Sequence, residues 1–222
     1  MDIEKNDVPA SAQVQEKNYI EAFDRGGKVN VLFIGNSITR HEPKLEIGWP
    51  HDWGMAASAK EKDYVHVAVK LLDEKLGKVN YCVANCGEWE LNYYDDGILQ
   101  RWKKARDFRA DILVIRIGEN IYNARDKFQT DPIAPHYAKM IEYFSANPNV
   151  KVVASDLFWA CEPIDSAIHK VAAEKGYVLV HLNDLGEKPE NKALGKFWHD
   201  GVAAHPSDEG MYQIAQRIVN AL

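Results

Sequence analysis

Residues 29–37 read VNVLFIGNS, a near-continuous apolar run that ends in glycine, asparagine and serine. An apolar run without alternation is typical of a β-strand that is buried on both faces of a sheet. Four further runs of this kind follow along the chain, and they are NYCVANCG (80–87), ILVIRIG (112–118), KVVASD (151–156) and YVLVHL (177–182). The sequence therefore predicts five buried strands.

Helix-like segments separate these predicted strands. They lie at 54–76, 95–107, 131–146 and 163–175, and a last segment covers 207–222. In this last segment the apolar residues recur at helical spacing, and Ser207 is the expected N-cap. Regular alternation of strand and helix predicts an α/β fold in which helices cover both faces of a five-stranded parallel sheet.

The 222 residues have an ordinary globular composition, with 46% hydrophobic and 27% charged residues, so disorder is not expected. Residues 1–17 are interpreted as a polar tail and 18–222 as a single domain. The net charge is −6 and no block of lysine or arginine occurs, which argues against a nucleic-acid partner and against attraction to anionic membranes. The apolar runs are too short to cross a bilayer, so we expect no membrane insertion.

Other short signals exclude several further classes. Three cysteines are too few for a disulfide framework and are expected to be small buried hydrophobes. GxGxxG and GxxxxGK[ST] are both absent, so no nucleotide cofactor is expected. The N-terminal residues have no signal-peptide pattern, which leaves the compartment open, because a signal removed earlier would leave a similar polar start. The oligomeric state is likewise open.

Four residues that can carry chemistry follow the predicted strands or precede the last helix. They are Ser37, Gly87, Asn120 and His205. In parallel α/β sheets, ligands bind outside the carboxyl ends of the strands, so these residues are expected at one rim. A serine hydroxyl becomes a nucleophile when a base such as histidine takes its proton. The backbone N–H groups of Ser37 and Gly87 and the amide of Asn120 are predicted to stabilise an oxyanion, as acyl transfer requires.

The motifs GNSIT (35–39), NCG (85–87), GEN (118–120) and His-Pro (205–206) resemble, in this order, the four blocks of the SGNH hydrolases, the GDSL-like esterases and lipases. The resemblance covers the chain from about residue 29 to its end. It implies a flavodoxin-like three-layer α/β/α sandwich and ester hydrolysis without a metal or other cofactor. It also implies that Ser37 is the nucleophile, that Gly87 and Asn120 are oxyanion donors, and that His205 is the base.

The acid that should orient the base departs from the family pattern. That pattern, DxxH, would place an aspartate at position 202, where this chain has Val202. The nearest upstream acid is Asp200, which is the first candidate to orient the ring of His205. Glu119, Glu88 or a backbone carbonyl are the alternatives.

Aromatic residues gather in the same predicted rim segments. Trp49, Trp53 and Trp89 are candidates for substrate binding, because flat amphipathic rings can stack on sugar rings. The alternative is that these rings only pack the long loops against the sheet. With no long aliphatic loop for an acyl chain, the pattern favours a small-molecule or saccharide ester, deacetylated by a serine esterase.

Two other functions are alternatives to the esterase. One is a non-catalytic carbohydrate-binding module on the same fold, since the DxxH acid is missing. The other is a metal-dependent phosphoesterase, for which His41, Glu42, His51 and Asp52, or His199 with Asp200 and His205, could supply ligands. Neither group has HExxH spacing or a helical histidine pair, so no metal is expected.

Overall fold

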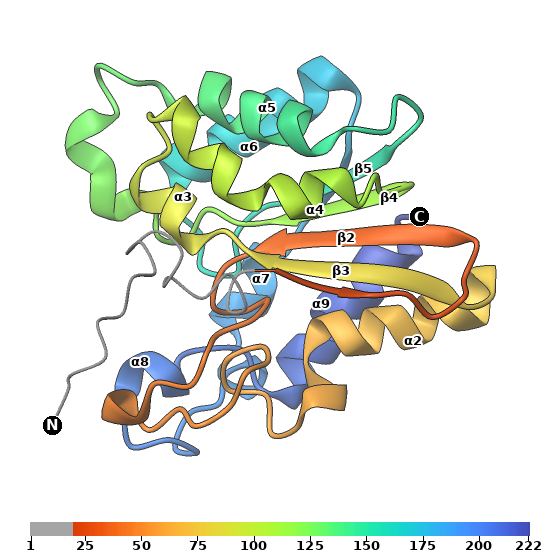
Figure 1. Ribbon diagram of the computed structural model, residues 1–222. Helices are drawn as coiled ribbons and strands as arrows, with labels where there is room; N and C mark the ends of the chain where they lie inside the picture. Colours follow the sequence, from red (N-terminus) through yellow and green to blue (C-terminus); the bar gives the residue numbers. More distant parts are fainter. Residues whose placement is uncertain (1–19) are drawn as a thin grey trace, which may run out of the picture.

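The computed structural model describes residues 20–222, and the predicted tail at 1–17 lies outside these residues. A six-stranded sheet runs through the centre in the order β1-β3-β2-β4-β5-β6 (Figure 1). The strands are β1 (Ile20–Phe23), β2 (Val29–Gly35), β3 (Val79–Asn85), β4 (Ile112–Arg116), β5 (Lys151–Ser155) and β6 (Val178–Val180). The strands β2 to β6 pair in parallel, whereas β1 pairs antiparallel with β3.

The five predicted strands are therefore confirmed as β2 to β6, and the strand count is corrected from five to six. The additional strand β1 is the short segment IEAF at the edge of the sheet. A four-residue edge strand that pairs on one side only needs no long apolar run, so the sequence pattern does not reveal it.

Helices cover both faces of the sheet, which confirms the three-layer α/β/α arrangement (Figure 1). The longer helices are α2 (Tyr64–Leu76), α5 (Ile133–Phe144), α6 (Glu162–Lys175) and α9 (Asp208–Asn220). The shorter α-helices are α3 (Gly87–Leu91), α4 (Lys103–Asp107), α7 (Asn183–Glu187) and α8 (Asp200–Ala203). Five 3₁₀-helices complete the elements of residues 20–222: η2 (Leu45–Ile47), η3 (Lys60–Lys62), η4 (Asp96–Trp102), η5 (Ile121–Lys127) and η6 (Pro189–Asn191).

A large hydrophobic core lies on each face of the sheet, and the side chains of β2 alternate between the two. Leu32 and Ile34 point to the face that α5 and α6 cover, whereas Val31 and Phe33 point to the face of α2 and α9. Successive side chains of a strand face opposite sides, so a strand between two helical layers must be apolar throughout. That requirement is the reason that residues 29–35 show no polar alternation.

The helix boundaries differ from the predicted ones where loops intervene. The helix expected at 54–76 begins only at Tyr64, because the side chain of Asp63 accepts the N–H of His66 at 2.8 Å and caps it. At the last helix, Ser207 is the N-cap as predicted, since its hydroxyl accepts the N–H of Gly210. Within residues 20–222, the helices are all too short or too polar to span a bilayer.

The strand order decides where a ligand can bind. The chain leaves β2 towards β3 on one side of it, and later returns to β4 on the other side. Such a reversal opens a crevice at the carboxyl ends of the neighbouring strands. The segments that follow β2, β3 and β4 therefore meet at one place.

Candidate active site

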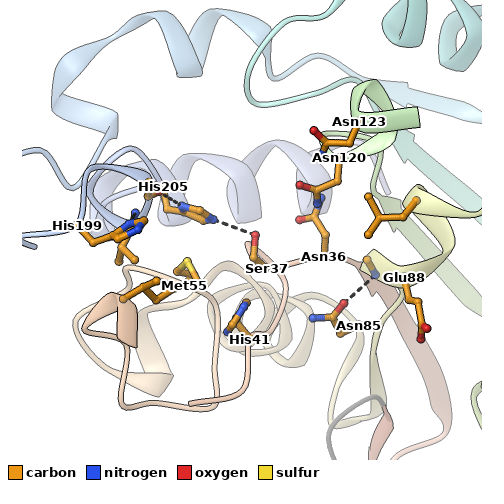
Figure 2. Close-up of a pocket in the computed structure, with 15 residues that line it drawn as sticks. Asn36, Ser37, His41, Met55, Asn85, Glu88, Asn120, Asn123, His199 and His205 are labelled. Carbon is orange, nitrogen blue, oxygen red and sulfur yellow. Dashed lines mark hydrogen bonds between the residues drawn. The ribbon is translucent and has the colours of Figure 1, made fainter. Parts of the chain in front are cut away.

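Ser37 lies two residues after the end of β2, at the rim of the sheet. Its Oγ is 2.9 Å from Nε2 of His205, which approaches from the turn before α9 (Figure 2). The two residues are 168 positions apart in the sequence. The fold therefore joins the predicted nucleophile and the predicted base in hydrogen-bond contact.

The other ring nitrogen of His205 contacts a backbone group. Its Nδ1 lies 2.6 Å from the carbonyl oxygen of Gly201. A carbonyl oxygen can only accept a hydrogen bond, so Nδ1 carries the proton and Nε2 is left to accept from Ser37. This contact orients the ring and selects the tautomer that a general base needs.

Asp200 does not orient His205, so this prediction is wrong. The residue is exposed and begins the short helix α8. The four residues between Asp200 and His205 coil into a helical turn, which brings the carbonyl of Gly201 to the ring. In a helical turn, a carbonyl faces the residue four positions ahead, which for Gly201 is His205. The longer spacing between Asp200 and His205 therefore places a main-chain oxygen, and not a carboxylate, beside the ring.

The two glutamates named as alternatives have other partners. Glu119 forms an ion pair with Arg116 at 2.6 Å and is buried. Glu88 lines the pocket but pairs with Arg101. Of the candidates that the sequence left open, the backbone carbonyl is the one in contact with the ring.

The surroundings of His205 favour its neutral form. The ring of Trp159 packs against the imidazole edge to face, with the ring centroids 5.1 Å apart. Desolvation, opposed by the Gly201 carbonyl and assisted by the nearby His41, lowers the pKa of His205 to about 4. The imidazole is therefore uncharged at neutral pH and able to accept a proton.

A pocket of about 520 Å³ opens beside Ser37. Its walls include Gly87 and Asn120 as well as His205, so the four predicted residues surround one cavity (Figure 2). The remaining lining residues are Asn36, His41, Ile47, Met55, Asn85, Glu88, Leu91, Asn123, His199, Gly201 and Val202.

Two of the three predicted oxyanion donors, Gly87 and Asn120, already form a hydrogen bond within the protein. The N–H of Gly87 donates to Oδ1 of Asn85 at 2.8 Å. The side-chain amide of Asn120 donates to Glu90 at 2.5 Å, and an amide nitrogen carries a second N–H. Asn120 thus keeps one donor for a ligand, whereas Gly87 would have to exchange its partner.

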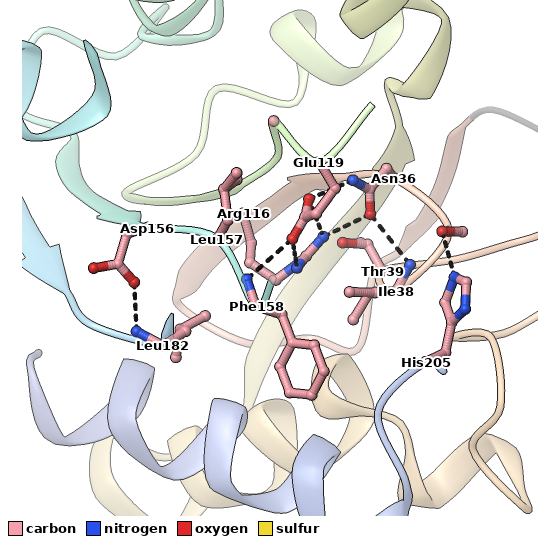
Figure 3. A network of polar contacts seen from close by, with 12 residues as sticks. Asn36, Ile38, Thr39, Arg116, Glu119, Asp156, Leu157, Phe158, Leu182 and His205 are labelled. Carbon is pink, nitrogen blue, oxygen red and sulfur yellow. Dashed lines mark hydrogen bonds and ion pairs between the residues drawn. The ribbon is translucent and has the colours of Figure 1, made fainter. Parts of the chain in front are cut away.

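A buried polar network lies directly behind Ser37. The Nδ2 of Asn36 donates to Glu119 at 2.6 Å and to Glu90 at 2.9 Å. The Oδ1 of Asn36 accepts from the guanidinium of Arg116 at 2.5 Å (Figure 3). Burial by itself raises the pKa of Glu119. The charge and hydrogen bonds of Arg116 outweigh this effect and hold that pKa below its usual range. The network keeps the loop after β2, which carries Ser37, in one geometry.

Glu90 connects this network to the predicted oxyanion residue. It is fully buried and accepts the backbone N–H groups of Gly118 at 2.7 Å and of Asn120 at 3.2 Å. Burial, together with the charge of Glu119, raises the pKa of Glu90. Glu90 therefore orients Asn120 through both its backbone and its side chain.

Asn36, Glu90 and Arg116 are not among the residues predicted from the sequence. A signal was present, because Arg116 ends the apolar strand ILVIR and is completely buried. A charged residue inside such a run requires a buried partner. The charged partner is Glu119, three positions further along, whereas the contact with Asn36 cannot be found in the sequence, since Asn36 and Arg116 are 80 residues apart.

The predicted aromatic platform is wrong for Trp49 and Trp89, which are 0% and 1% exposed. Trp49 packs edge to face on Trp53, whose Nε1 donates to the carbonyl of Ala57. Trp53 is half-buried and does not line the pocket. The exposed indole is Trp198, which is 72% exposed and contacts the ring of His199 in the pocket wall. The alternative prediction, that Trp49, Trp53 and Trp89 pack the loops against the sheet, agrees with these contacts.

Of the residues named as possible metal ligands, His41, His199 and His205 line this pocket, but their ligand atoms do not converge. The ring of His51 stacks on Trp53 with the centroids 4.0 Å apart, and His41 contacts the carbonyl of Glu42. Among residues 20–222, no three histidine, cysteine or carboxylate side chains converge beside Ser37.

Solved structures share this architecture. A structure from Bacteroides ovatus described as a GDSL-like lipase superposes with a TM-score of 0.59 at 16% identity, covering 86% of this chain and 96% of that one. An acetyl xylan esterase superposes with a TM-score of 0.58 at 20% identity, covering 87% and 100%. A family 3 carbohydrate esterase from Clostridium thermocellum gives 0.57 at 16% identity, covering 85% and 92%. The chain has the SGNH (GDSL-like) hydrolase fold.

In the comparisons with known proteins, the matches to this chain are solved structures. No family model matches the sequence, and no curated protein matches it. At 16–20% identity the comparison establishes the SGNH fold, and the reaction has to be argued from the site.

Proposed function

We propose that this SGNH-fold protein is a serine esterase that hydrolyses carboxylic esters. The contact that carries the proposal is the 2.9 Å approach of Ser37 Oγ to Nε2 of His205. A serine beside a neutral imidazole whose other nitrogen is fixed has the arrangement of an activated nucleophile.

The reaction follows from this geometry in two steps. Ser37 attacks the ester carbonyl while Nε2 of His205 takes the hydroxyl proton and then passes it to the leaving alcohol. In the second step His205 takes a proton from water, which attacks the acyl carbon. The bond between the acyl carbon and Ser37 Oγ then breaks, the imidazolium returns its proton to Oγ, and the carboxylic acid leaves. The free N–H of Asn120 and the backbone N–H groups of Ser37 and Gly87 are the donors proposed for the oxyanion.

The substrate class that we propose is an acetylated saccharide. Support comes from the polar side chains on the pocket wall, such as Asn85, Asn123 and His199, which suit sugar hydroxyls. The exposed ring of Trp198 beside His199 offers a stacking surface at the pocket edge. Two structural neighbours are described as an acetyl xylan esterase and a carbohydrate esterase.

Ser37→Ala tests the proposal. The wild-type protein should hydrolyse 4-nitrophenyl acetate and be labelled covalently by an organophosphonate, and Ser37→Ala should lose both properties. Ser166→Ala is the matched control, because Ser166 is exposed on α6 and bonds only to Glu162. Wild-type turnover in Ser37→Ala would contradict the proposal, and saccharide binding without turnover would favour the carbohydrate-binding module.

A further inference from the structure

A second cluster of reactive side chains lies outside the pocket. Asp156 follows β5, His181 follows β6, and His169 lies on α6. One ligand atom of each residue lies within 4.8 Å of the other two. In the part of the chain that the structure describes, this is the one group of three such side chains.

The carboxylate of Asp156 is oriented towards the two histidines. Its Oδ1 accepts the backbone N–H of Leu182 at 2.5 Å (Figure 3). Its Oδ2 lies 2.7 Å from Nδ1 of His181 and 3.2 Å from Nε2 of His169. One oxygen is thus held by the backbone while the other faces both imidazole nitrogens. Carboxylates that bind metals are often oriented by a hydrogen bond of this kind.

The three ligand atoms lie close enough together to share one ion. The two imidazoles are nearly perpendicular, at 88°, with their centroids 5.4 Å apart. Asp156 is 1% exposed, whereas the side chains of His169 and His181 are 40% and 68% exposed. The carboxylate is therefore buried and the two imidazoles lie at the surface, where water can complete the coordination.

Arg217, which contacts the backbone of His181, does not oppose a cation strongly. Arg217 donates to the carbonyl of His181 at 2.7 Å and forms a two-point ion pair with Asp184. Its charge is therefore compensated by Asp184, which leaves the carboxylate of Asp156 as the local negative charge.

We propose that Asp156, His169 and His181 bind a divalent transition ion of the zinc class. Two imidazoles and one carboxylate are ligands that zinc and cobalt prefer, whereas magnesium and calcium prefer oxygen only. The ion replaces the two N–H protons that now bridge the histidines to Asp156, and it links the ends of β5 and β6 to α6. The site is separate from Ser37, so it would be a structural or regulatory site.

The test is calorimetric titration of zinc chloride into the untagged full chain after EDTA treatment and dialysis. One equivalent should bind, and His169→Ala and His181→Ala should each weaken the affinity by at least about tenfold. Both side chains are partly or largely exposed, so these variants should fold, which circular dichroism checks.

His136→Ala is the matched control. His136 also contacts one aspartate, Asp96 at 3.3 Å, but no second histidine joins them. The zinc affinity of the His136→Ala variant should equal that of the wild type. The same holds for Ser37→Ala, so this proposal can be tested separately from the esterase. Zinc should raise Tm, and cobalt should give a visible absorption band, in the wild type but not in His169→Ala.

Two outcomes would overturn the zinc site. One is a wild-type protein that binds no zinc, in which case the cluster only satisfies a buried carboxylate by hydrogen bonds. The other is zinc binding that persists unchanged in both His169→Ala and His181→Ala.

Discussion

Nδ1 of His205 lies 2.6 Å from the carbonyl oxygen of Gly201, in the position that a carboxylate takes in a Ser–His–Asp triad. Both groups fix the tautomer, since each accepts the Nδ1 proton. They differ when His205 becomes charged during the reaction, because a carbonyl offers a dipole where a carboxylate offers a full charge. The base of this site is therefore oriented by the main chain.

Asp200→Asn should lower kcat by less than about tenfold, because the Gly201 carbonyl still holds the tautomer. Removal of a true triad acid costs up to about 10⁴ in kcat. Turnover of 4-nitrophenyl acetate by the purified variant measures the difference. A loss of about a thousandfold or more, with the fold intact, would return the acid's role to Asp200.

Activity should persist to low pH. His205 acts in its neutral form, and its pKa is lowered to about 4, so activity disappears only when the pH falls towards that value. An imidazole with an ordinary pKa would lose half its activity near pH 6.5. The measurement is kcat/KM from about pH 7 to 4 on 4-nitrophenyl acetate.

That profile needs a control for folding. The unfolded chain takes up a proton on His205 at a higher pH than the folded chain does, so protein stability falls as the pH drops from about 6.5 to 4. Near-UV circular dichroism over the same range shows whether the fold persists. A loss of activity close to pH 6.5, in a protein that is still folded, would contradict the inferred desolvation of His205.

Asn120→Ala should lower kcat by roughly 10²–10³ with little change in KM, because the amide acts on charge that develops in the transition state. Steady-state kinetics on 4-nitrophenyl acetate separate the two constants. Asn123→Ala is the control, since Asn123 also lines the pocket but is not a proposed oxyanion donor. A pure KM effect in Asn120→Ala would make Asn120 a substrate-binding residue.

Arg116→Met should lower the free energy of unfolding by about 3–5 kcal/mol, because it leaves Glu119 buried without its partner. Urea denaturation measures this change. Arg101→Met is the matched control: Arg101 pairs with Glu88 at the surface, and such exposed pairs contribute about 0–1 kcal/mol. Equal losses in the two variants would show that the buried network does not stabilise the protein.

Trp198→Ala should weaken hydrolysis of an acetylated oligosaccharide more than hydrolysis of 4-nitrophenyl acetate, which needs no stacking surface. Tyr212→Ala is the control, because Tyr212 is an exposed aromatic on α9 whose hydroxyl contacts Gln216, whereas Trp198 contacts His199 of the pocket wall. Trp49→Ala should instead lower Tm and affect both substrates alike, as loss of a buried ring does. Equal effects of Trp198→Ala on both esters would remove the stacking proposal.

The sequence by itself determined the parallel strands of the sheet and the place of the site. Strands β2 to β6 were predictable because burial on both faces requires apolar residues throughout a short run. The placement of Ser37, Gly87 and Asn120 at one rim was also predictable, since parallel strands end at the same edge. Both are consequences of local pattern and of general topology.

Only the tertiary structure decided which groups these residues contact. Whether Asp200 or the Gly201 carbonyl reaches His205 depends on one helical turn, α8, whose path the spacing does not specify. The burial of Trp49 depends on how the loops fold over it. The partners of Asn36 and of Asp156 lie on distant segments, and their hydrogen bonds depend on side-chain directions that are fixed only when the layers pack.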